Sequence, residues 1–267
     1  GYHSNIQDSL EISYNRLDEF ISALVKGIKT PVKKFNDIGM FNDLGVPQQI
    51  STGILQIENE LYDIVRPKRS GPSGSRPATL LKKGGIEYLE LRGIDINPFI
   101  PEGIDVSKIK LLDIYIAHSL ISESPLMLNK EIKEIKANQK IMVSNGRLKN
   151  VMLNKGGELV SLTELRKNFL AELEQTAEAL DEYSEGYLDA FYLETNKNNL
   201  RSEKILNDME SKGFEFKDYA LNQSKIIAEN YNSCDSCDFS ALTNSAQASI
   251  EKLRILEESS SMEINKY

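Results

Sequence analysis

Apolar residues recur every three or four positions in several stretches of the chain, a spacing that predicts amphipathic helices. The first of these helices is expected over residues 13–29, with Ser13 as its N-cap and Pro31 just beyond its end. Its apolar positions are Leu17, Phe20, Leu24 and Ile28. The Gly-, Asn- and Asp-rich residues 36–53 that follow are predicted to form a loop.

From residue 105 onward the pattern is helical. Residues 130–143 are predicted as one helix, and residues 187–267 as two or three more polar helices with a frayed acidic end. Two further helices are marked by apolar series, one by Val106, Ile109, Leu112, Ile116 and Leu120, the other by Leu165, Phe169, Leu173, Ala177 and Leu180.

Apolar and polar residues alternate only in the first part of the chain. Residues 54–69 are expected to form a strand, and residues 86–92 a second strand preceded by Gly84 and Gly85. A sheet-containing first part and a helical second part predict the α+β class. The expected division is residues 1–104, part of a catalytic α+β domain, and residues 105–267, a helical region packed on it.

Composition narrows the class of protein. Of the 267 residues, 40% are hydrophobic and 27% are charged, as in soluble globular proteins, and no apolar run is long enough to span a membrane. A net charge of −8, from 40 acidic and 32 basic residues, argues against nucleic-acid binding. Two cysteines indicate no disulfide framework, so a reducing cytoplasm is the expected location.

The sequence GGIEYLELRGIDINPF, residues 84–99, places two charged side chains within a strand. Residues two apart on a strand share a face, so Tyr88, Glu90 and Arg92 are expected to project together. An exposed ion pair of little energetic value would explain the pattern. A charged cleft would explain it too, because a carboxylate can bind Mg²⁺ and an arginine can bind a phosphate through two N–H groups. If the strand predicted over 54–69 is adjacent, Glu58, Glu60 and Tyr62 face the same cleft.

A basic cluster follows the first predicted strand. Arg66, Lys68 and Arg69 precede the Gly/Ser/Pro segment 70–77, which contains Arg76. This cluster is consistent with a polyphosphate site or with a solvated basic turn. Neither a Walker A loop nor a dinucleotide-binding glycine motif is present in the sequence.

The remaining candidate groups are weak signals. Cys234 and Cys237 form a single CxxC without a second pair, which is little evidence for zinc or redox chemistry. The histidines are His3 and His118, and His118 lies among apolar helix residues, which predicts a packed side chain.

Taken together, these strings resemble the glutamate–cysteine ligases of the proteobacterial type. The resemblance is carried by LQIENELYDIVRPKR at 55–69 and LLKKGGIEYLELRGIDINPF at 80–99, in the order and spacing of the family. It extends back to GYHSN at the start and IKTP at 28–31, and it weakens after about residue 120.

The resemblance implies a glutamine-synthetase-like fold and an ATP-dependent ligation. In that reaction ATP phosphorylates the γ-carboxylate of L-glutamate, and the amine of L-cysteine attacks the acyl phosphate, which is the first step of glutathione biosynthesis. Mg²⁺ is the implied cofactor. By position in the motifs, Glu90 matches a Mg²⁺ ligand of the family and Arg92 matches a contact to the transferring phosphate. Tyr2 and Tyr62 match tyrosines of the cysteine pocket. Arg66 and Arg69 match basic positions that are assigned to nucleotide binding.

Family members are longer at the N-terminus, where further metal ligands and glutamate contacts lie. The chain is therefore expected to be a C-terminal portion that requires the missing part and is inactive alone, with a severed sheet edge prone to aggregation. Two alternatives remain: a non-catalytic interaction or regulatory module derived from the ligase fold, and a ligase that joins glutamate to another amine. Oligomeric state, glutathione feedback inhibition and the role of residues 187–267 are not indicated by the sequence.

Overall fold

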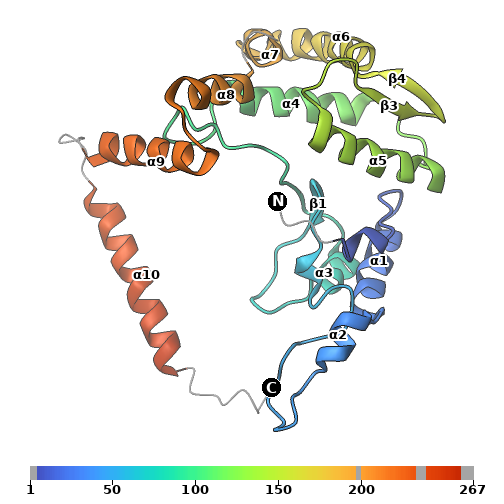
Figure 1. Ribbon diagram of the computed structural model, residues 1–267, viewed down its shortest axis with the longest axis vertical. Coiled ribbons are helices and arrows are strands. Elements are labelled where there is room, and N and C mark those ends of the chain that lie inside the picture. Colours follow the sequence, from blue (N-terminus) through green and yellow to red (C-terminus); the bar gives the residue numbers. More distant parts are fainter. Residues whose placement is uncertain (1–4, 197–199, 233–238, 260–267) are drawn as a thin grey trace. The chain divides into compact units, whose positions relative to one another are not determined.

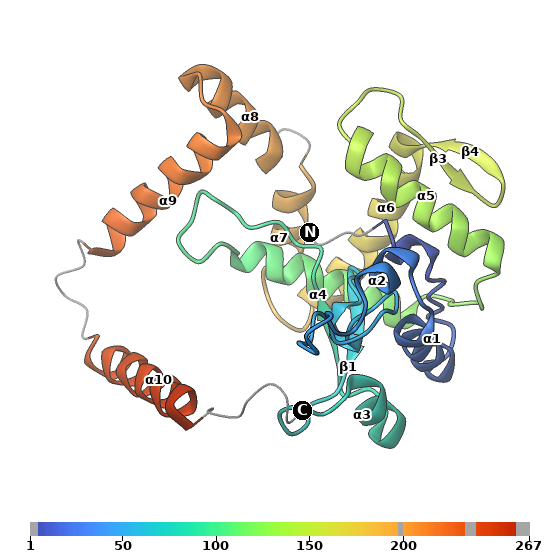
Figure 2. The same cartoon turned by 60° about the horizontal axis from the view of Figure 1, so that its bottom comes forward.

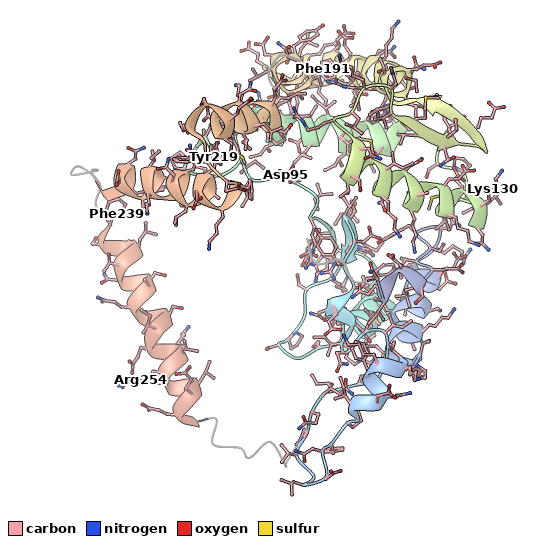
Figure 3. All side chains as sticks on the ribbon, viewed as in Figure 1. Asp95, Lys130, Phe191, Tyr219, Phe239 and Arg254 are labelled. Carbon is pink, nitrogen blue, oxygen red and sulfur yellow. The ribbon has the colours of Figure 1, made fainter. Side chains whose placement is uncertain are left out.

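The computed structural model describes residues 5–196, 200–232 and 239–259. The chain separates into two compact units, Gly1–Ile94 with Ser236–Tyr267, and Asp95–Asp235. Asp95, labelled in Figure 3, therefore begins the second unit. Helices predominate, accompanied by two small antiparallel sheets (Figure 1), in agreement with the α+β class. In the part of the chain that is described, no helix combines the length and apolar character needed to cross a membrane.

The first unit is built around one apolar core. Its elements are η1 Gln7–Ser9, α1 Leu17–Lys29, α2 Lys33–Ile38, η2 Glu58–Glu60, β1 Val65–Lys68, α3 Pro77–Gly84, β2 Tyr88–Leu91 and α10 Ser240–Ser259. The core joins α1 and α3 with the loop segments between them, because burying apolar side chains removes them from water. Its buried members include Leu10, Phe20, Leu24, Leu55, Leu61 and Leu81.

Helix α1 confirms the amphipathic pattern of the sequence but begins later than expected. Phe20 and Leu24 are buried, and Leu17 and Ile28 pack against the same core. The expected N-cap is wrong: Arg16 occupies that position, and the hydroxyl of Ser13 instead donates to Glu19. The loop predicted from residue 36 is also shortened, because α2 extends to Ile38.

The strand expected over residues 54–69 is mostly absent. Residues 58–60 form a 3-10 helix, and the strand proper is β1, Val65–Lys68. The alternating pattern is misleading here because Leu55 and Leu61 are buried in the core while Ile57 is exposed. The second strand is confirmed as β2, which pairs antiparallel with β1 so that Arg66 lies opposite Glu90 and Lys68 opposite Tyr88.

Helix α3 was not expected from the sequence, which indicated a loop up to residue 77. Pro77 occupies the first helical position, where a missing N–H has no consequence. Leu81 and Ala78 anchor the helix in the core. Gly85 follows at a φ of 74°, a conformation that glycine adopts without the strain of a side chain, and turns the chain into β2.

The second unit is a helical assembly with one hairpin. Its elements are α4 Val106–Ile121, α5 Asn129–Asn145, β3 Met152–Lys155, β4 Glu158–Ser161, α6 Leu162–Asp181, α7 Tyr187–Thr195, α8 Arg201–Lys212 and α9 Phe216–Asn232. Helices α5 and α6 confirm the sequence prediction. The region from residue 187 holds four described helices, α7 to α10, rather than two or three.

The core of the second unit lies between α4, α6 and α7. Ile114, Leu173, Ala177 and Phe191 are its buried members, and Phe191 is labelled in Figure 3. The apolar face predicted for α4 is wrong in part, since Val106, Ile109, Ile116 and Leu120 are exposed while Ile114 is fully buried. The helix packs on α6 and α7 through Ile114 and Leu111 instead.

The hairpin β3–β4 beside α5, visible in Figures 1 and 2, was also not predicted. Gly156 and Gly157 join its strands with φ values of 64° and 92°, the left-handed pair that tight two-residue hairpin turns require. Asn138 of α5 fixes the hairpin by two side-chain hydrogen bonds to the backbone of Asn154, at 2.7 and 2.8 Å.

The loop that precedes α4 belongs to the second unit. Asp105 is the N-cap of α4 and accepts from the Lys108 amide at 2.9 Å. It also accepts from the buried Asn97 side chain at 2.9 Å and from Arg201 of α8 at 2.6 Å. This places DINPF, residues 95–99, with the helices that follow, although the sequence had grouped it with the strands before it.

Candidate active site

A buried arginine links the two strands of the first unit. The Arg66 side chain is 6% exposed, and its Nη2 and Nε donate to the same Glu90 oxygen, Oε2, at 2.8 and 3.1 Å. Its Nη1 donates to the backbone carbonyls of Leu61 and Asn59 at 2.5 and 3.2 Å. Arg66 therefore fixes Glu90 and the segment before Tyr62 in one arrangement.

Glu90 and Arg92 share a face of β2 as strand parity predicts. Arg92 Nε donates to Glu90 Oε2 at 2.9 Å, and both side chains are about one-third exposed, at 33% and 31%. Burial raises the pKa of the Glu90 carboxyl, but hydrogen bonds from Arg66 and Arg92 outweigh this effect and hold the pKa below its ordinary value. Glu90 is thus an ionised carboxylate between two guanidinium groups.

Tyr62 joins this group from the loop after η2. The Arg92 guanidinium carbon lies 6.0 Å from the centroid of the Tyr62 ring, at the limit of a cation–π contact. The structure thus brings Tyr62, Glu90 and Arg92 together, with Arg66 behind them. Tyr2, the other tyrosine singled out from the sequence, lies outside the described residues.

Glu58 and Glu60 lie in the 3-10 helix η2 and not on a strand, so the face expected from strand parity is not formed; Glu60 Oε2 accepts from the Gln56 amide. Glu58 has a side chain 2% exposed and accepts from Arg76 Nε at 2.9 Å and from the Ala78 amide at 2.7 Å. Ala78 is in the first turn of α3, whose amides lack partners within the helix. Glu58 therefore caps α3 from another part of the chain, an arrangement without a local sequence signal.

The basic cluster is largely occupied by the protein itself. Arg69 Nη1 donates to the carbonyl of Gly84, the last residue of α3, at 2.6 Å. Arg76 is paired with Glu58, and Arg66 with Glu90. These three side chains hold α3, the 3-10 segment and the two strands together.

Among the described residues, Glu90 is the carboxylate that the sequence indicated as a Mg²⁺ ligand. Glu90 Oε2 is occupied by both arginines, whereas Oε1 accepts only a 3.4 Å contact from Arg92. Mg²⁺ requires octahedral oxygen coordination. In residues 5–196, 200–232 and 239–259, no group of three or more His, Cys, Asp or Glu is placed to hold a metal. Glu90 alone therefore fits as one ligand and does not constitute a site.

The weaker candidates take no part in this cluster. His118 lies in the second unit, where its ring is mostly buried, with Nδ1 3.3 Å from the Thr176 hydroxyl and an edge-on contact to Phe169. This confirms the prediction of a packed side chain. Cys234, Cys237 and His3 lie outside the described residues.

Comparisons with known proteins agree on one family. The sequence model of the Glutamate-cysteine ligase family matches residues 1–142. The chain is 35% identical over 248 residues to the glutamate–cysteine ligase of Alcanivorax borkumensis, covering 89% of this chain and 47% of that protein. It is 38% identical over 183 residues to that of Vibrio vulnificus, covering 68% of this chain and 35% of that protein.

A solved structure agrees with these sequence matches. The crystal structure of the glutamate–cysteine ligase of Francisella tularensis in complex with AMP matches with a TM-score of 0.86 at 25% identity. The match covers 100% of this chain and 54% of that one.

The identities and coverages show which family the chain belongs to and how much of its relatives' length the chain spans. The chain spans about half the length of the curated relatives that it matches over most of its own length. The family match, residues 1–142, includes both strands and the cluster of Tyr62, Arg66, Glu90 and Arg92, and it covers more than half of the 267 residues. On this evidence the chain belongs to the glutamate–cysteine ligase family.

Proposed function

We propose that this chain supplies part of the active site of an ATP-dependent ligase that joins the γ-carboxylate of L-glutamate to the amine of L-cysteine through a γ-glutamyl phosphate. This is the first step of glutathione biosynthesis. The observation that supports it best is the grouping of Tyr62, Glu90 and Arg92 on one partly exposed face, backed by Arg66. Packing of the strand against the core does not require these three side chains on its partly exposed face.

Arg92 is the proposed contact to the transferring phosphoryl group. Its side chain is 33% exposed, so N–H groups remain accessible while Nε is held by Glu90. Fixed guanidinium donors stabilise negative charge that develops in a transition state without the cost of reorganising water. The pairing with Glu90 preorganises Arg92 for that role.

Tyr62, together with Tyr2, is the proposed wall of the cysteine pocket. The Tyr62 ring lies next to the Arg92 guanidinium, so an amine held against the ring would be near a phosphoryl group held by Arg92. Holding two reactants in the right relative geometry can provide much of the acceleration of a two-substrate reaction.

Glu90 is the proposed Mg²⁺ ligand, through Oε1. Bound Mg²⁺ would neutralise charge on the phosphates of ATP. The other ligands would come from phosphates, water and residues beyond those described. Arg66 and Arg69, assigned to the nucleotide side by resemblance, would act by holding the backbone around the site, since both donate to protein groups.

The isolated chain is proposed to be inactive and to need the portion of the relatives that it does not span. Support comes from the described residues, which bring together no group of three or more side chains that could hold a metal, and from the share of the relatives that is covered. The complete catalytic domain is proposed to be glutamine-synthetase-like, a larger sheet in which β1 and β2 are two of the strands.

The test is to assay the complete protein that contains this chain, and the chain alone, for γ-glutamylcysteine from ATP, glutamate and cysteine. We expect product only from the complete protein. Product formed with other amines but not with cysteine would favour a different glutamate ligase. No ATP-dependent product with any amine would favour a non-catalytic module.

The site assignment is tested in the same protein with matched variants. Glu90→Gln is expected to lower kcat more than about tenfold and to raise the Mg²⁺ concentration for half-maximal rate. Glu87→Gln, just before β2, where the carboxylate accepts from the Ser70 amide, is expected to do neither. Tyr62→Ala is expected to raise KM for cysteine far more than KM for ATP. An unchanged Mg²⁺ titration in Glu90→Gln would remove Glu90 from the metal site.

A further inference from the structure

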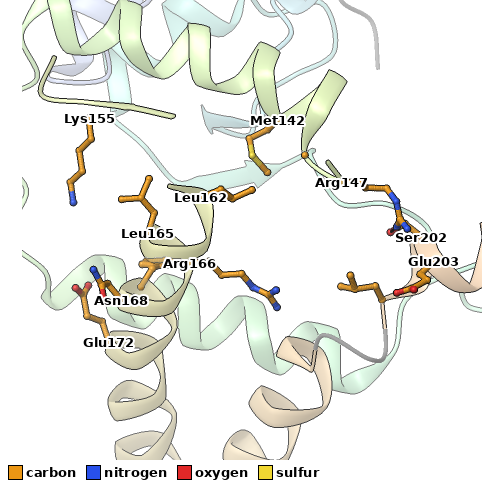
Figure 4. A pocket seen from close by; sticks show the side chains of 13 residues that line it. Met142, Arg147, Lys155, Leu162, Leu165, Arg166, Asn168, Glu172, Ser202 and Glu203 are labelled. Carbon is orange, nitrogen blue, oxygen red and sulfur yellow. Dashed lines mark hydrogen bonds between the residues drawn. The ribbon is translucent and has the colours of Figure 1, made fainter. Parts of the chain in front are cut away.

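The second unit contains a pocket that the proposed ligase chemistry does not use. It has a volume of about 980 Å³ and is bounded by α5, β3, α6 and α8 (Figure 4). Leu162, Leu165 and Phe169 contribute one apolar side from α6, and Met142 of α5 adds to it. The volume falls within the range of about 300–1,000 Å³ that is typical of small-molecule sites, and the lining combines apolar with polar side chains.

Three cationic side chains line the same pocket. They are Arg147 after α5, Lys155 of β3 and Arg166 of α6. Arg147 donates to the Ser202 hydroxyl, and Arg166 Nη2 donates to the Thr195 carbonyl at 2.8 Å, so the described partners of both guanidinium groups are uncharged. Within the described part of the chain, none of the three cations forms an ion pair with a carboxylate.

Cations without a carboxylate partner are unusual in a chain whose acidic residues outnumber its basic ones. With 40 acidic and 32 basic residues, carboxylates are in excess and cations have many possible partners. The carboxylates that do line the pocket, Glu172 and Glu203, lie at opposite ends of it in Figure 4. Glu172 Oε2 is 3.5 Å from His118 Nε2, which directs that carboxylate toward α4.

We propose that this pocket binds an amphipathic organic anion. The apolar body of the ligand lies over Leu165, Leu162 and Met142, and its carboxylate, phosphate or sulfonate group accepts from Arg147 and Arg166. In Figure 4 Arg166 extends from α6 toward the end of the pocket where Arg147 and Ser202 lie. Two guanidinium groups without carboxylate partners are suited to a shared oxyanion, because each presents N–H donors in a planar fork.

The experiment uses two probes with the same ring system. The anionic probe is 8-anilinonaphthalene-1-sulfonate, and the neutral probe is N-phenyl-1-naphthylamine. Both are titrated into the full chain, with affinity measured by fluorescence and stoichiometry by calorimetry, at low and high salt. We expect one site that binds the sulfonate more tightly than the neutral probe, with a preference that falls as salt rises.

Variants assign the binding to this pocket. Arg147→Met is expected to weaken sulfonate binding about tenfold, the usual effect of losing one charge-assisted hydrogen bond, and to leave the neutral probe unaffected. Leu165→Asp is expected to weaken both probes. The matched control is Lys167→Met, an identical loss of charge on the exposed side of α6.

Thermal unfolding by circular dichroism shows whether each variant is folded, and Arg147→Lys, which keeps the charge, replaces Arg147→Met if that variant unfolds. With Arg147→Lys the expected loss is smaller and still confined to the anionic probe. Equal loss of sulfonate affinity in Arg147→Met and Lys167→Met would overturn the proposal. So would equal binding of the two probes, or no saturable binding of the sulfonate.

Discussion

Arg66 and Glu90 face each other across the antiparallel pair β1–β2, and both bonds from Arg66 converge on a single carboxylate oxygen of Glu90. The opposite-charge pair is therefore part of the sheet as well as of the site. Because Arg66 also binds the carbonyls of Leu61 and Asn59, the loop that carries Tyr62 and the strand that carries Glu90 depend on one side chain.

Replacing Arg66 is expected to be costly for stability. Arg66→Met leaves Glu90 and two carbonyls without their buried partner and is expected to lower the free energy of unfolding by about 3 kcal/mol, as when one member of a buried pair is removed. Urea denaturation followed by circular dichroism measures the change. Arg16→Met is the control, because Arg16 and Asp18 form a pair exposed at 66% and 72% and should change stability by less than about 1 kcal/mol. Similar losses in both variants would contradict a special role for Arg66.

Glu58 is expected to matter for α3 rather than for chemistry. Glu58→Ala removes the acceptor of the Ala78 amide and the partner of Arg76, and the expected loss of stability is about 2 kcal/mol. Hydrogen exchange measured by mass spectrometry should show faster exchange in residues 77–84. Glu11→Ala, at an exposed site, is the comparison and should leave that exchange unchanged. Protection of α3 that survives the loss of Glu58 would show that the cap is dispensable.

The second unit is expected to lose stability in acid through Glu194. Burial raises the pKa of this carboxyl, but bonds from Arg201, Lys108 and Ser107 outweigh it and lower the pKa to about 2. The ordinary value is 4.5, so the charged form is favoured by folding. Its stabilisation is complete above the unfolded pKa and is lost as pH falls from about 4.5 toward about 2.

Thermal melts of the wild type and Glu194→Gln check this prediction. The wild type should melt higher at pH 6, and the gap should close as pH falls below about 4.5, the ordinary carboxyl value. Glu182→Gln, at an exposed position, is expected to show a small gap that changes little with pH. A gap for Glu194→Gln that stays constant down to pH 3 would mean that its ionisation does not stabilise the fold.

Gly53 is expected to tolerate no side chain. It is buried and bridges to Pro31, and a Cβ at this position would lie 2.1 Å from the Ile28 carbonyl oxygen. Gly53→Ala must displace backbone and is expected to lower the free energy of unfolding by about 3 kcal/mol. Gly45→Ala meets no atom within 4 Å but has a φ of 75°, so strain alone should reduce stability by about 1 kcal/mol. Equal effects on the urea midpoint would show that the close approach at Gly53 relaxes freely.

The sequence by itself determined the elements whose cause is local. The three- and four-residue spacing predicted α1, α5 and α6, strand parity placed Glu90 and Arg92 on one face, and the strings around residues 55–69 and 80–99 indicated the family. Each of these depends on neighbouring residues or on a stretch long enough to be distinctive. Such signals remain whether or not the rest of the chain is considered.

Only the tertiary structure decided which partner each charged side chain takes. The alternation over 54–62 indicated a strand, but burial of Leu55 and Leu61 in the core set a 3-10 turn there instead. Glu58 caps a helix about twenty residues away, and Arg66 pairs with Glu90 across the sheet. A carboxylate or guanidinium binds whichever opposite group the fold brings within about 3 Å, and that distance is set by packing between segments remote in sequence.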